Sequence, residues 1–359
     1  MHVPDGFINA PVSVAAGVVA AGAVAVALRG ARRELGGTPH AAGHGGERTA
    51  PLAGLVAAFV FAVQMLNFPV AAGTSGHLLG GALAAILVGP YTGVLVVSVV
   101  LLMQAVLFAD GGLTALGVNI LLMGVVTVVV AYALFRALVR VLPRRRSSVT
   151  AASFLAALVS VPAAAAAFTL LYAVGGTTDV PVGTVLAAMV GVHVLIGVGE
   201  AVITAATVGA VLAVRPDLVY GARGLTAPLK LRVGGELVDA PAPAPEPAPV
   251  HPPRSTRTVW GVGAAIAVVL AAFVSFYASA SPDGLERVAA DQGIDREVRD
   301  HGLAGSPLAD YGVAGIDDPR LSVGLAGAIG VAGTIAVGTG VFTVVRRRRD
   351  ARRQDRETV

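Results

Sequence analysis

Residues 183–214, GTVLAAMVGVHVLIGVGEAVITAATVGAVLAV, decide the class of fold to which this chain belongs. His193 and Glu200 are the only ionisable side chains in this stretch. A helix needs about 20 consecutive apolar residues to cross the hydrocarbon core of a bilayer. The stretch therefore predicts a membrane-spanning helix that carries two ionisable groups inside the membrane.

The composition of the whole chain agrees with this interpretation. Of its 359 residues, 55% are hydrophobic and 13% are charged, and the mean hydropathy is +0.77. Soluble domains of this length do not have such a composition, so we expect a multi-pass protein of the cell membrane, surrounded by lipid. There is no cysteine, which excludes disulfides and thiolate metal sites. A transition metal would therefore need nitrogen or oxygen ligands.

The basic residues limit the range of functions. The sequence pI is ≈ 9.8, but the arginines fill the gaps between apolar runs and do not share one folded face. We therefore expect no nucleic-acid partner. The only lysine, Lys230, is followed by Leu231, whereas a P-loop requires Gly-Lys-Ser or Gly-Lys-Thr. We expect no ATPase motor of that kind in this chain.

Apolar runs predict an all-α bundle of about seven plus two transmembrane helices. Runs long enough to span lie at 11–29, 51–67, 91–109, 113–142, 149–174, 183–214, 258–280 and 322–345. A shorter run at 77–90 is interpreted as a ninth, short or tilted span. The first run lacks a basic flank and a clear cleavage site, so we expect a retained helix and not a signal peptide.

The distribution of arginine and lysine predicts the orientation, because these residues accumulate in cytoplasmic segments. If the N-terminus is outside, nine spans place the C-terminus inside, and 22 of the 26 Arg and Lys residues are cytoplasmic. Four remain outside: Arg287, Arg296, Arg299 and Arg320. We therefore expect Met1 on the outer face, where an imported ion would arrive.

A proline-rich segment, APAPAPEPAPVHPP at 240–253, divides the chain into two units, because it can neither form a helix nor pack a core. We predict a membrane unit at 1–215, a cytoplasmic linker at 216–257, a two-helix unit at 258–345 with an outer loop at 281–321, and a basic tail at 346–359. The outer loop could be a small globular cap, an acidic antechamber for cations or a solvated loop. Charge alone favours the solvated loop.

The first eight residues, MHVPDGFI, carry the clearest chemistry. The α-amine of Met1, the backbone nitrogen of His2 and the His2 imidazole can close a five-membered and a six-membered ring on one metal. If the backbone nitrogen loses its proton, the chelate is nearly planar, which suits Ni(II), Cu(II) or Co(II). This chemistry needs a free α-amine on Met1. The alternative is that His2 is a chance residue at a disordered terminus.

The stretch QMLNFPVAAGTSGH at 64–77 predicts a partner for this chelate. Asn67 lies at the end of the second helix and is expected to support the site, and residues 73–76 predict a flexible loop on the same side as Met1. If this loop folds inward, His77 supplies the fourth nitrogen of a planar site. The alternative is that His77 caps a helix or bonds a carbonyl.

Four further residues are candidates for supporting the site. Thr74 and Ser75 either orient the imidazole of His77 or cap the helix that begins near it. His193 and Glu200 are seven residues apart and share a helix face. They serve either the folded-in N-terminus and the metal, or a hydrogen-bonded structural pair between helices, which we favour slightly.

Several segments together resemble a known family. MHVPDGF (1–7), NFPV (67–70) with GTSGHLLGG (73–81), and FADGGLT (108–114) resemble the CbiM/NikM proteins, the substrate-binding membrane subunits of energy-coupling-factor (ECF) transporters for cobalt and nickel. This resemblance covers about 1–215. SPDGLE (281–286) and SPLADYG (306–312) are similar to the CbiN/NikN partner, or PDGLE domain. The chain thus looks like a natural fusion of the two.

The resemblance implies that the Met1 amine and the His2 nitrogens bind metal together with His77. It also implies a transmembrane coupling subunit and a pair of ABC ATPases as partners, a role in cobalt or nickel transport and cobalamin biosynthesis, and no cofactor beyond the transported ion. Val3 stands where the family often has isoleucine, but it donates no ligand. The linker would keep one unit close to the other.

We therefore expect an ECF substrate-capture subunit without its own ATPase. The second unit is expected to help load or eject the metal, so that deletion of residues 258–359 would lower uptake. One alternative is a proton-coupled secondary transporter that uses His193 and Glu200. Another is a membrane enzyme, for which we find no paired carboxylates or nucleophile–base pair. The predicted ligands do not distinguish cobalt from nickel. The Irving–Williams order of affinities favours nickel. We nevertheless favour cobalt as the transported ion.

Overall fold

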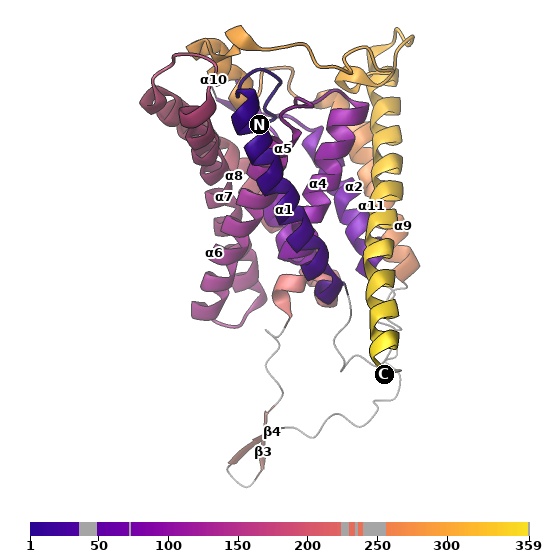
Figure 1. Ribbon diagram of the computed structural model, residues 1–359. Helices are drawn as coiled ribbons and strands as arrows, with labels where there is room; N and C mark the ends of the chain where they lie inside the picture. The colour runs from indigo at the N-terminus through magenta and orange to yellow at the C-terminus, as the bar shows by residue number, and fades with distance from the viewer. Residues whose placement is uncertain (36–48, 72, 224–229, 234–235, 240–255, 358–359) are drawn as a thin grey trace.

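The structure, a computed structural model, describes residues 1–35, 49–71, 73–223, 230–233, 236–239 and 256–357. Its long helices run side by side between the two ends of a bundle (Figure 1). The tip that carries Met1 lies at the upper end in this view, and α11 ends at the lower one. Because the arginine distribution predicts that the upper end faces outside, we call the two ends outer and inner.

Long apolar helices build the bundle. They are α1 (Ala10–Glu34), α2 (Thr49–Gln64), α4 (Pro90–Leu107), α7 (Arg146–Gly175), α8 (Val182–Val214), α9 (Thr256–Ala272) and α11 (Pro319–Glu357). A further continuous helix combines α5 (Leu116–Asn119), the π-helical η2 (Ile120–Val126) and α6 (Thr127–Val141). In the described ranges, 7 helices are long and apolar enough to cross a membrane. This confirms the predicted all-α, multi-pass fold.

The short run predicted at 77–90 crosses the bundle in an unusual way. Only α3 (Gly81–Val88) is helical, and its 8 residues rise only ~12 Å. Residues 77–80 form no helix, and every residue of α3 is buried. Non-helical backbone is tolerated at membrane depth only where protein surrounds it. Besides the 7 long helices, the described ranges contain the shorter apolar helix Ala50–Gln64. The run at 77–90 is short, as predicted.

Side chains from two helices satisfy the backbone of this non-helical stretch. Glu200 on α8 accepts hydrogen bonds from the backbone nitrogens of Leu79 (2.5 Å) and Gly80 (3.1 Å). Gln64, the last residue of α2, donates to the carbonyl oxygen of Leu79 (2.9 Å). No water is available inside a bilayer for these groups, so the bonds allow the chain to unwind directly after His77.

The loop predicted at 73–76 is not flexible. Strands β1 (Phe68–Ala71) and β2 (Thr74–Gly76) pair as an antiparallel hairpin, and all of β2 is buried. Burial of these small polar residues requires partners for their backbone groups. One partner comes from far along the chain, because the backbone nitrogen of Ser75 donates to the carbonyl of Pro282 (2.8 Å).

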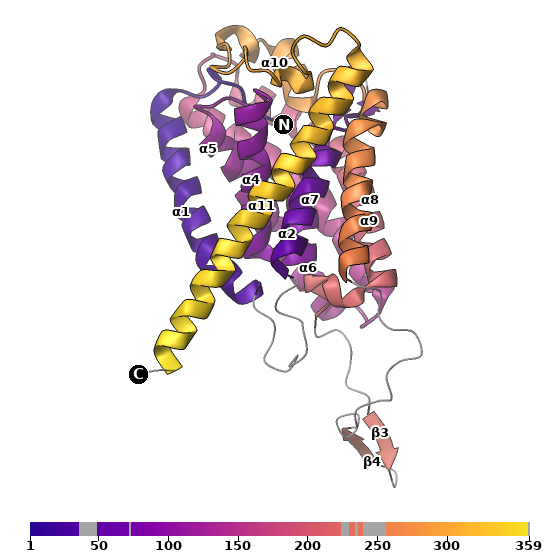
Figure 2. The ribbon, with the colours of Figure 1, turned by 90° about the vertical axis from the view of Figure 1, so that its right-hand side faces the viewer.

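A folded segment between α9 and α11 covers the outer end (Figure 1). It contains η5 (Val274–Tyr277), α10 (Gly284–Gln292), η6 (Ile294–Glu297) and η7 (Ala309–Tyr311). Leu285, Val288 and Ile294 are buried in the same core as the membrane helices. Figure 2 shows α11 running obliquely down from this segment across the bundle. Of the three possibilities for residues 281–321, the structure shows a folded cap, and we call residues 278–318 the cap.

The inner end carries the remaining short elements. They are η3 (Pro216–Leu218), η4 (Tyr220–Ala222) and the paired strands β3 (Lys230–Val233) and β4 (Glu236–Asp239). The proline-rich segment at 240–253 lies outside the described residues. Its predicted role as a tether therefore stays a prediction.

Candidate metal centre

The N-terminal tip is folded inward beneath the cap. Met1 and Val3 are buried, with exposed fractions of 2% and 0%. Asn119 holds Val3 from both sides: its Oδ1 accepts from the backbone nitrogen (2.8 Å) and its Nδ2 donates to the carbonyl (3.1 Å). The π-helical turn η2 begins directly after Asn119, and such turns are frequent at functional sites. The possibility of a disordered terminus is therefore excluded.

Asp5 fixes the turn that follows. Its carboxylate accepts hydrogen bonds from the backbone nitrogens of Leu113 (3.1 Å) and Thr114 (2.8 Å) and from the Thr114 hydroxyl (2.5 Å). Gly6 has a φ of +98°, and a Cβ there would lie 2.0 Å from the carbonyl oxygen of Glu297 in the cap. Only glycine lets the tip and the cap approach this closely.

The structure brings Met1 and His77 together. The α-amine nitrogen of Met1 lies 2.6 Å from Nε2 of His77. The rings of His2 and His77 pack edge to face, with centroids 5.1 Å apart. Two nitrogens at right angles around a metal, each at a typical bond length, are about 2.8 Å apart. The amine and Nε2 are therefore spaced as two adjacent ligands of one metal would be.

The nitrogens of the two imidazoles have different partners. Nδ1 of His77 lies 3.0 Å from the carbonyl oxygen of Leu78, so Nδ1 carries the proton and the Nε2 lone pair faces the amine. Nδ1 of His2, which would close the six-membered ring, is buried and lies 2.8 Å from Oδ1 of Asp110. The Met1 amine and Nε2 of His77 thus fit two positions of the predicted four-nitrogen set.

Half of the predicted ligands belong to the main chain. In the described part of the chain, no group of three or more His, Cys, Asp or Glu side chains could hold a metal ion. The predicted set has two imidazoles, one amine and one backbone nitrogen, so it contains only two side chains.

Two carboxylates flank the nitrogens. Oδ2 of Asp283, in the cap, accepts a hydrogen bond from the Met1 amine (2.6 Å) and lies 3.6 Å from Nε2 of His77. Asp110, which follows α4, has Oδ1 2.8 Å from Nδ1 of His2. Two negative charges therefore frame the centre, and a buried cation requires such compensation.

The carboxylates are held ionised. Burial alone would raise the pKa of Asp283, but the charge of the Met1 amine and the contact with His77 lower it well below its usual range. Burial would also raise the pKa of Asp110, but the neighbouring His2 and a hydrogen bond from Tyr311 lower it to about 2. That bond joins the Tyr311 hydroxyl to Oδ2 of Asp110 (2.5 Å). Burial and the Asp110 charge raise the pKa of Tyr311 well above its usual value, so it stays a donor.

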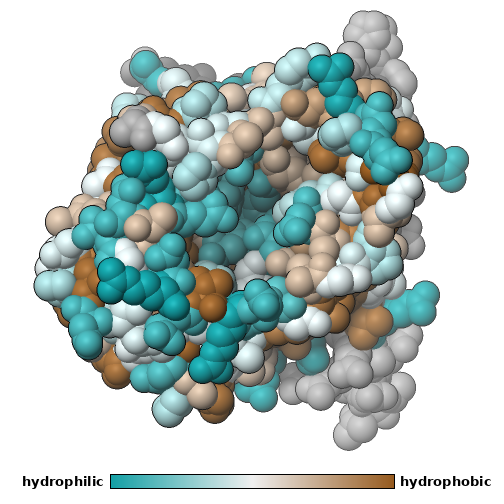
Figure 3. All heavy atoms as spheres, turned by 90° about the horizontal axis from the view of Figure 1, so that it is seen from above, coloured by the Kyte–Doolittle hydropathy of each residue, from teal (hydrophilic) through white to brown (hydrophobic). Residues whose placement is uncertain are grey.

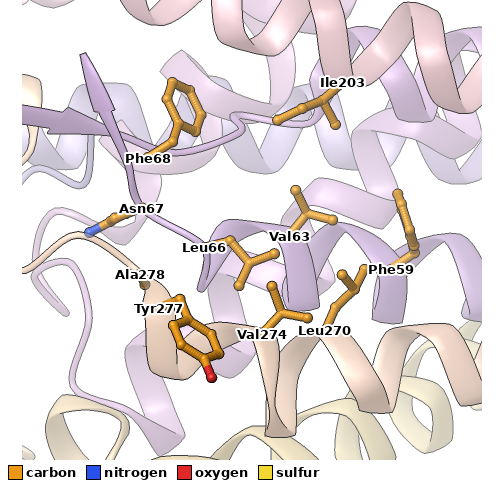
Figure 4. A pocket seen from close by; sticks show the side chains of 10 residues that line it. All are labelled: Phe59, Val63, Leu66, Asn67, Phe68, Ile203, Leu270, Val274, Tyr277 and Ala278. Atoms are coloured by element: carbon orange, nitrogen blue, oxygen red, sulfur yellow. The ribbon is translucent and has the colours of Figure 1, made fainter.

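Asn67 lies next to the start of the cap. It lines an apolar pocket between α2 and the start of the cap, with neighbours that include Phe68, Tyr277 and Ala278 (Figure 4). Its carbonyl oxygen accepts a hydrogen bond from the backbone nitrogen of Ser279 (2.7 Å). Asn67 therefore contacts the cap through its main chain.

Thr74 and Ser75 do not cap a helix, as one predicted alternative required. The helix after His77 begins only at Gly81, and no side chain caps it. The hydroxyl of Ser75 donates to the carbonyl oxygen of Ser281 (2.7 Å) and so binds the cap. Thr74 is buried in the same strand. In the described structure, the hairpin holds the cap over the centre.

In the described structure, the hydrogen bonds of His193 and Glu200 go to backbone groups and not to each other. Glu200 instead holds the backbone after His77. Nδ1 of His193 donates to the carbonyl oxygen of Met189 (2.8 Å), and the ring lies against Gly284 of the cap. Met1, Asp283 and His77 are close enough to interact electrostatically with His193.

Several residues at the centre were missed from sequence. They are Asp5, Asp110, Asn119, Asp283 and Tyr311. Four of them lie within the segments that carried the family resemblance, so a signal was present there. Asn119 is a polar residue inside an apolar run, which marks it as a candidate for a hydrogen bond between helices but not as a residue of the centre.

Comparisons with known proteins identify the family of each unit. The model of the CbiM family, described as the cobalt uptake substrate-specific transmembrane region, matches residues 2–218. The model of the PDGLE domain matches residues 257–347. The fused nickel transport protein NikMN of Rhodobacter capsulatus is 32% identical over 371 residues, covering 96% of this chain and 98% of that protein.

Shorter matches point the same way. The cobalt transport protein CbiM of Sorangium cellulosum is 38% identical over 176 residues, which cover 47% of this chain and 76% of that protein. A crystal structure of a transition metal transporter matches with 25% identity and a TM-score of 0.50, covering 60% of this chain and 93% of its own. The chain therefore belongs to the CbiM family, fused to a PDGLE domain, and it is a multi-pass membrane subunit for metal transport.

Proposed function

We propose that this chain is the substrate-capture subunit of an ECF importer for nickel or cobalt, and that four nitrogens bind the ion. They are the Met1 α-amine, the backbone nitrogen and Nδ1 of His2, and Nε2 of His77. The observation that carries this proposal is the 2.6 Å approach of the amine to Nε2 in a buried site. The ion would arrive at the outer face, where hydrophilic side chains surround a hollow (Figure 3).

The folded tip reduces the entropic cost of closing the chelate. Asn119 and Asp5 hold the residues that follow the ligands, so the amine and the His2 nitrogens are ordered before a metal arrives. Binding requires that the amine release a proton, and a planar chelate requires the same of the His2 backbone nitrogen. Metal capture should therefore release protons and strengthen as pH rises.

Both nickel and cobalt are proposed as the transported ion, because the ligand chemistry and the names of related proteins allow either. A set of four nitrogens without oxygen ligands disfavours Mg²⁺ and Ca²⁺, and the Irving–Williams order places nickel above cobalt in affinity. The relative that matches nearly the whole chain is named for nickel, whereas the family description names cobalt. Competition between the two ions for the purified chain will rank them, and we expect nickel to bind more tightly.

We propose that partner subunits, and not this chain, supply the energy for metal uptake. The sequence carries no P-loop. The resemblance to ECF transporters supplies the partners: a transmembrane coupling subunit and a pair of ABC ATPases. Uptake into proteoliposomes that contain the assembled complex should require ATP. Uptake by this chain alone, driven by a proton gradient, would contradict the proposal.

The decisive experiment changes the α-amine and nothing else. One residue is added before Met1, which converts the amine into an amide while every side chain keeps its place. We expect Ni(II) and Co(II) binding by the purified chain to be lost. Intact mass must first show that Met1 is the terminal residue of the unmodified protein.

A matched control uses the same extension, followed by a protease site that is cut to regenerate Met1. Cleavage should restore binding. If the uncut extension binds metal as tightly as the native chain, the terminal chelate is excluded.

A further inference from the structure

We propose that Asp283 of the cap is a positioning residue of the metal centre, so that the second unit of the chain directly sets the affinity of a site whose ligands all lie in the first. This inference rests on the proposed function and adds a role for the PDGLE segment. It is carried by the hydrogen bond from the Met1 amine to Oδ2 of Asp283 (2.6 Å).

The main chain around Asp283 is fixed on the first unit from two sides. The backbone nitrogen and the hydroxyl of Ser75 donate to the carbonyl oxygens of Pro282 (2.8 Å) and Ser281 (2.7 Å). On the other side, a Cβ at Gly284 would lie 2.6 Å from the side chain of Ile196 on α8. The absence of a side chain at Gly284 therefore lets the start of α10 rest against α8.

The two carboxylate oxygens of Asp283 have separate tasks. Oδ1 accepts from the backbone nitrogens of Leu285 (2.7 Å) and Glu286 (2.9 Å) and so caps α10. The side chain of Glu286 closes a capping box by accepting from the backbone nitrogen of Asp283 (2.8 Å). Because these hydrogen bonds at the start of α10 fix the carboxylate, Oδ2 is aimed at the Met1 amine.

This bond can persist when a metal is present. An amine bound to a metal through its lone pair still carries two hydrogens, and one of them can donate to Oδ2 of Asp283. The charge also balances, because an ammonium group is replaced by a divalent ion and one deprotonated backbone nitrogen, and both arrangements carry one positive charge. Groups that orient metal ligands in this way commonly contribute 10- to 100-fold in affinity, as an order of magnitude.

A second residue of the cap acts on the other side of the centre. The hydroxyl of Tyr311 donates to Asp110, whose other oxygen lies 2.8 Å from Nδ1 of His2. The ring of Tyr311 stacks on Phe108 with centroids 4.8 Å apart. Asp310 and Tyr311 both have positive φ, 53° and 56°, although neither is glycine. Such strained backbone clusters at functional sites, and here it delivers the hydroxyl to Asp110.

The test measures Ni(II) affinity of the full chain in which Asp283→Asn or Asp283→Ser has been introduced. Asparagine and serine cap helices about as well as aspartate, so α10 should keep its cap while the charge at Oδ2 is lost. We expect affinity to fall by about 10- to 100-fold. The ligand-field spectrum at metal saturation should be unchanged, because the four nitrogens remain.

Asp291→Asn is the matched control. Asp291 lies on the same helix, is exposed, and pairs with Arg287 on the surface (2.9 Å). We expect no change in affinity. Hydrogen exchange at the amides of residues 284–292 shows in every variant whether α10 is folded, so a loss of affinity with α10 intact supports the proposal.

Two outcomes would overturn the role of Asp283. One is unchanged affinity in both variants with α10 folded. The other is a changed spectrum at saturation, which would make Asp283 a ligand. Failure of the proposed function is distinguishable, because in that case the extended N-terminus of the otherwise unmodified chain would still bind metal.

Discussion

The α-amine of Met1 and Nε2 of His77 lie 2.6 Å apart, although 76 residues separate them in the sequence. Each is held by contacts with neighbouring residues. Asn119 fixes the tip through Val3, and Glu200 fixes the backbone that follows His77. The distance is therefore a property of the surrounding bundle, and loss of any of these contacts should weaken metal binding while leaving the ligands in the chain.

His77→Asn should lower Ni(II) affinity by more than about 100-fold, beyond the range expected for a supporting residue. The reason is that the fourth nitrogen of the planar set is lost, so the spectrum of any bound metal should also change. His301→Asn is the control, since His301 lies in the cap and its Nδ1 accepts only from the backbone nitrogen of Leu303 (3.0 Å). Equal effects of the two substitutions would show that His77 is not a ligand.

Asn119→Ala should lower metal affinity by about 10-fold or more, because the tip loses both hydrogen bonds that order Val3. The spectrum at saturation should not change. Asn67→Ala is matched in size and should bind metal normally, since Asn67 contacts the cap through its carbonyl oxygen. A loss of affinity in Asn67→Ala would restore our expectation that Asn67 supports the site.

Glu200→Gln should lower metal affinity and thermal stability together. A glutamine has only one acceptor oxygen, so one of the backbone nitrogens of Leu79 and Gly80 would lose its partner in a buried place. A buried backbone nitrogen without a hydrogen-bond acceptor lowers the free energy of unfolding by about 1–3 kcal/mol. Thr204→Val, one turn further along α8, removes a buried hydroxyl that has no partner in the described structure and should be neutral.

The same variant separates two kinds of transporter. If Glu200 carried protons in a secondary transporter, Glu200→Gln would abolish proton-coupled uptake and leave equilibrium metal binding intact. The bonds to backbone nitrogens instead require that binding itself be weakened. Measurement of affinity and transport on the same preparation distinguishes these results.

The membrane helices were predictable because the length of an apolar run by itself determines whether it can span a bilayer. The run at 183–214 became α8 (Val182–Val214) almost residue for residue. The unwinding of 77–80 was not predictable, because it depends on Glu200 and Gln64, which approach from other helices. A local pattern contains no information about such partners.

The residues of the centre also fall into those that were predictable from local sequence and those that were not. Met1 and His2 could be selected because their chelate chemistry is local, and His77 because it follows a break in the apolar pattern. Asp283 and Tyr311 reach the centre only when the cap folds over the first unit. The hairpin at Phe68–Gly76 was mistaken for a flexible loop for the same reason, since its burial depends on the backbone of Ser281 and Pro282.

The ion pair between Met1 and Asp283 predicts how stability depends on pH in the metal-free chain. The pKa of Asp283 is lowered in the folded state well below the value of about 3.8 that an unfolded chain has. A group with a lowered pKa contributes stability above its unfolded pKa, and this contribution is lost as pH falls towards the folded pKa. Wild type should therefore melt at a higher temperature than Asp283→Asn in the presence of a chelator.

The gap between the two melting temperatures should stay constant from about pH 7 to pH 5 and should narrow below about pH 4, where the unfolded carboxyl begins to take up protons. Asp291→Asn, whose carboxyl is exposed, should show no gap at any of these values. A gap that persists undiminished below pH 3 would assign the effect to packing or to the cap of α10 and not to the charge of Asp283. If the two melting temperatures are equal at pH 7, His77 alone satisfies the ammonium group of Met1. The ion pair between Met1 and Asp283 would then contribute nothing to the stability of the folded chain.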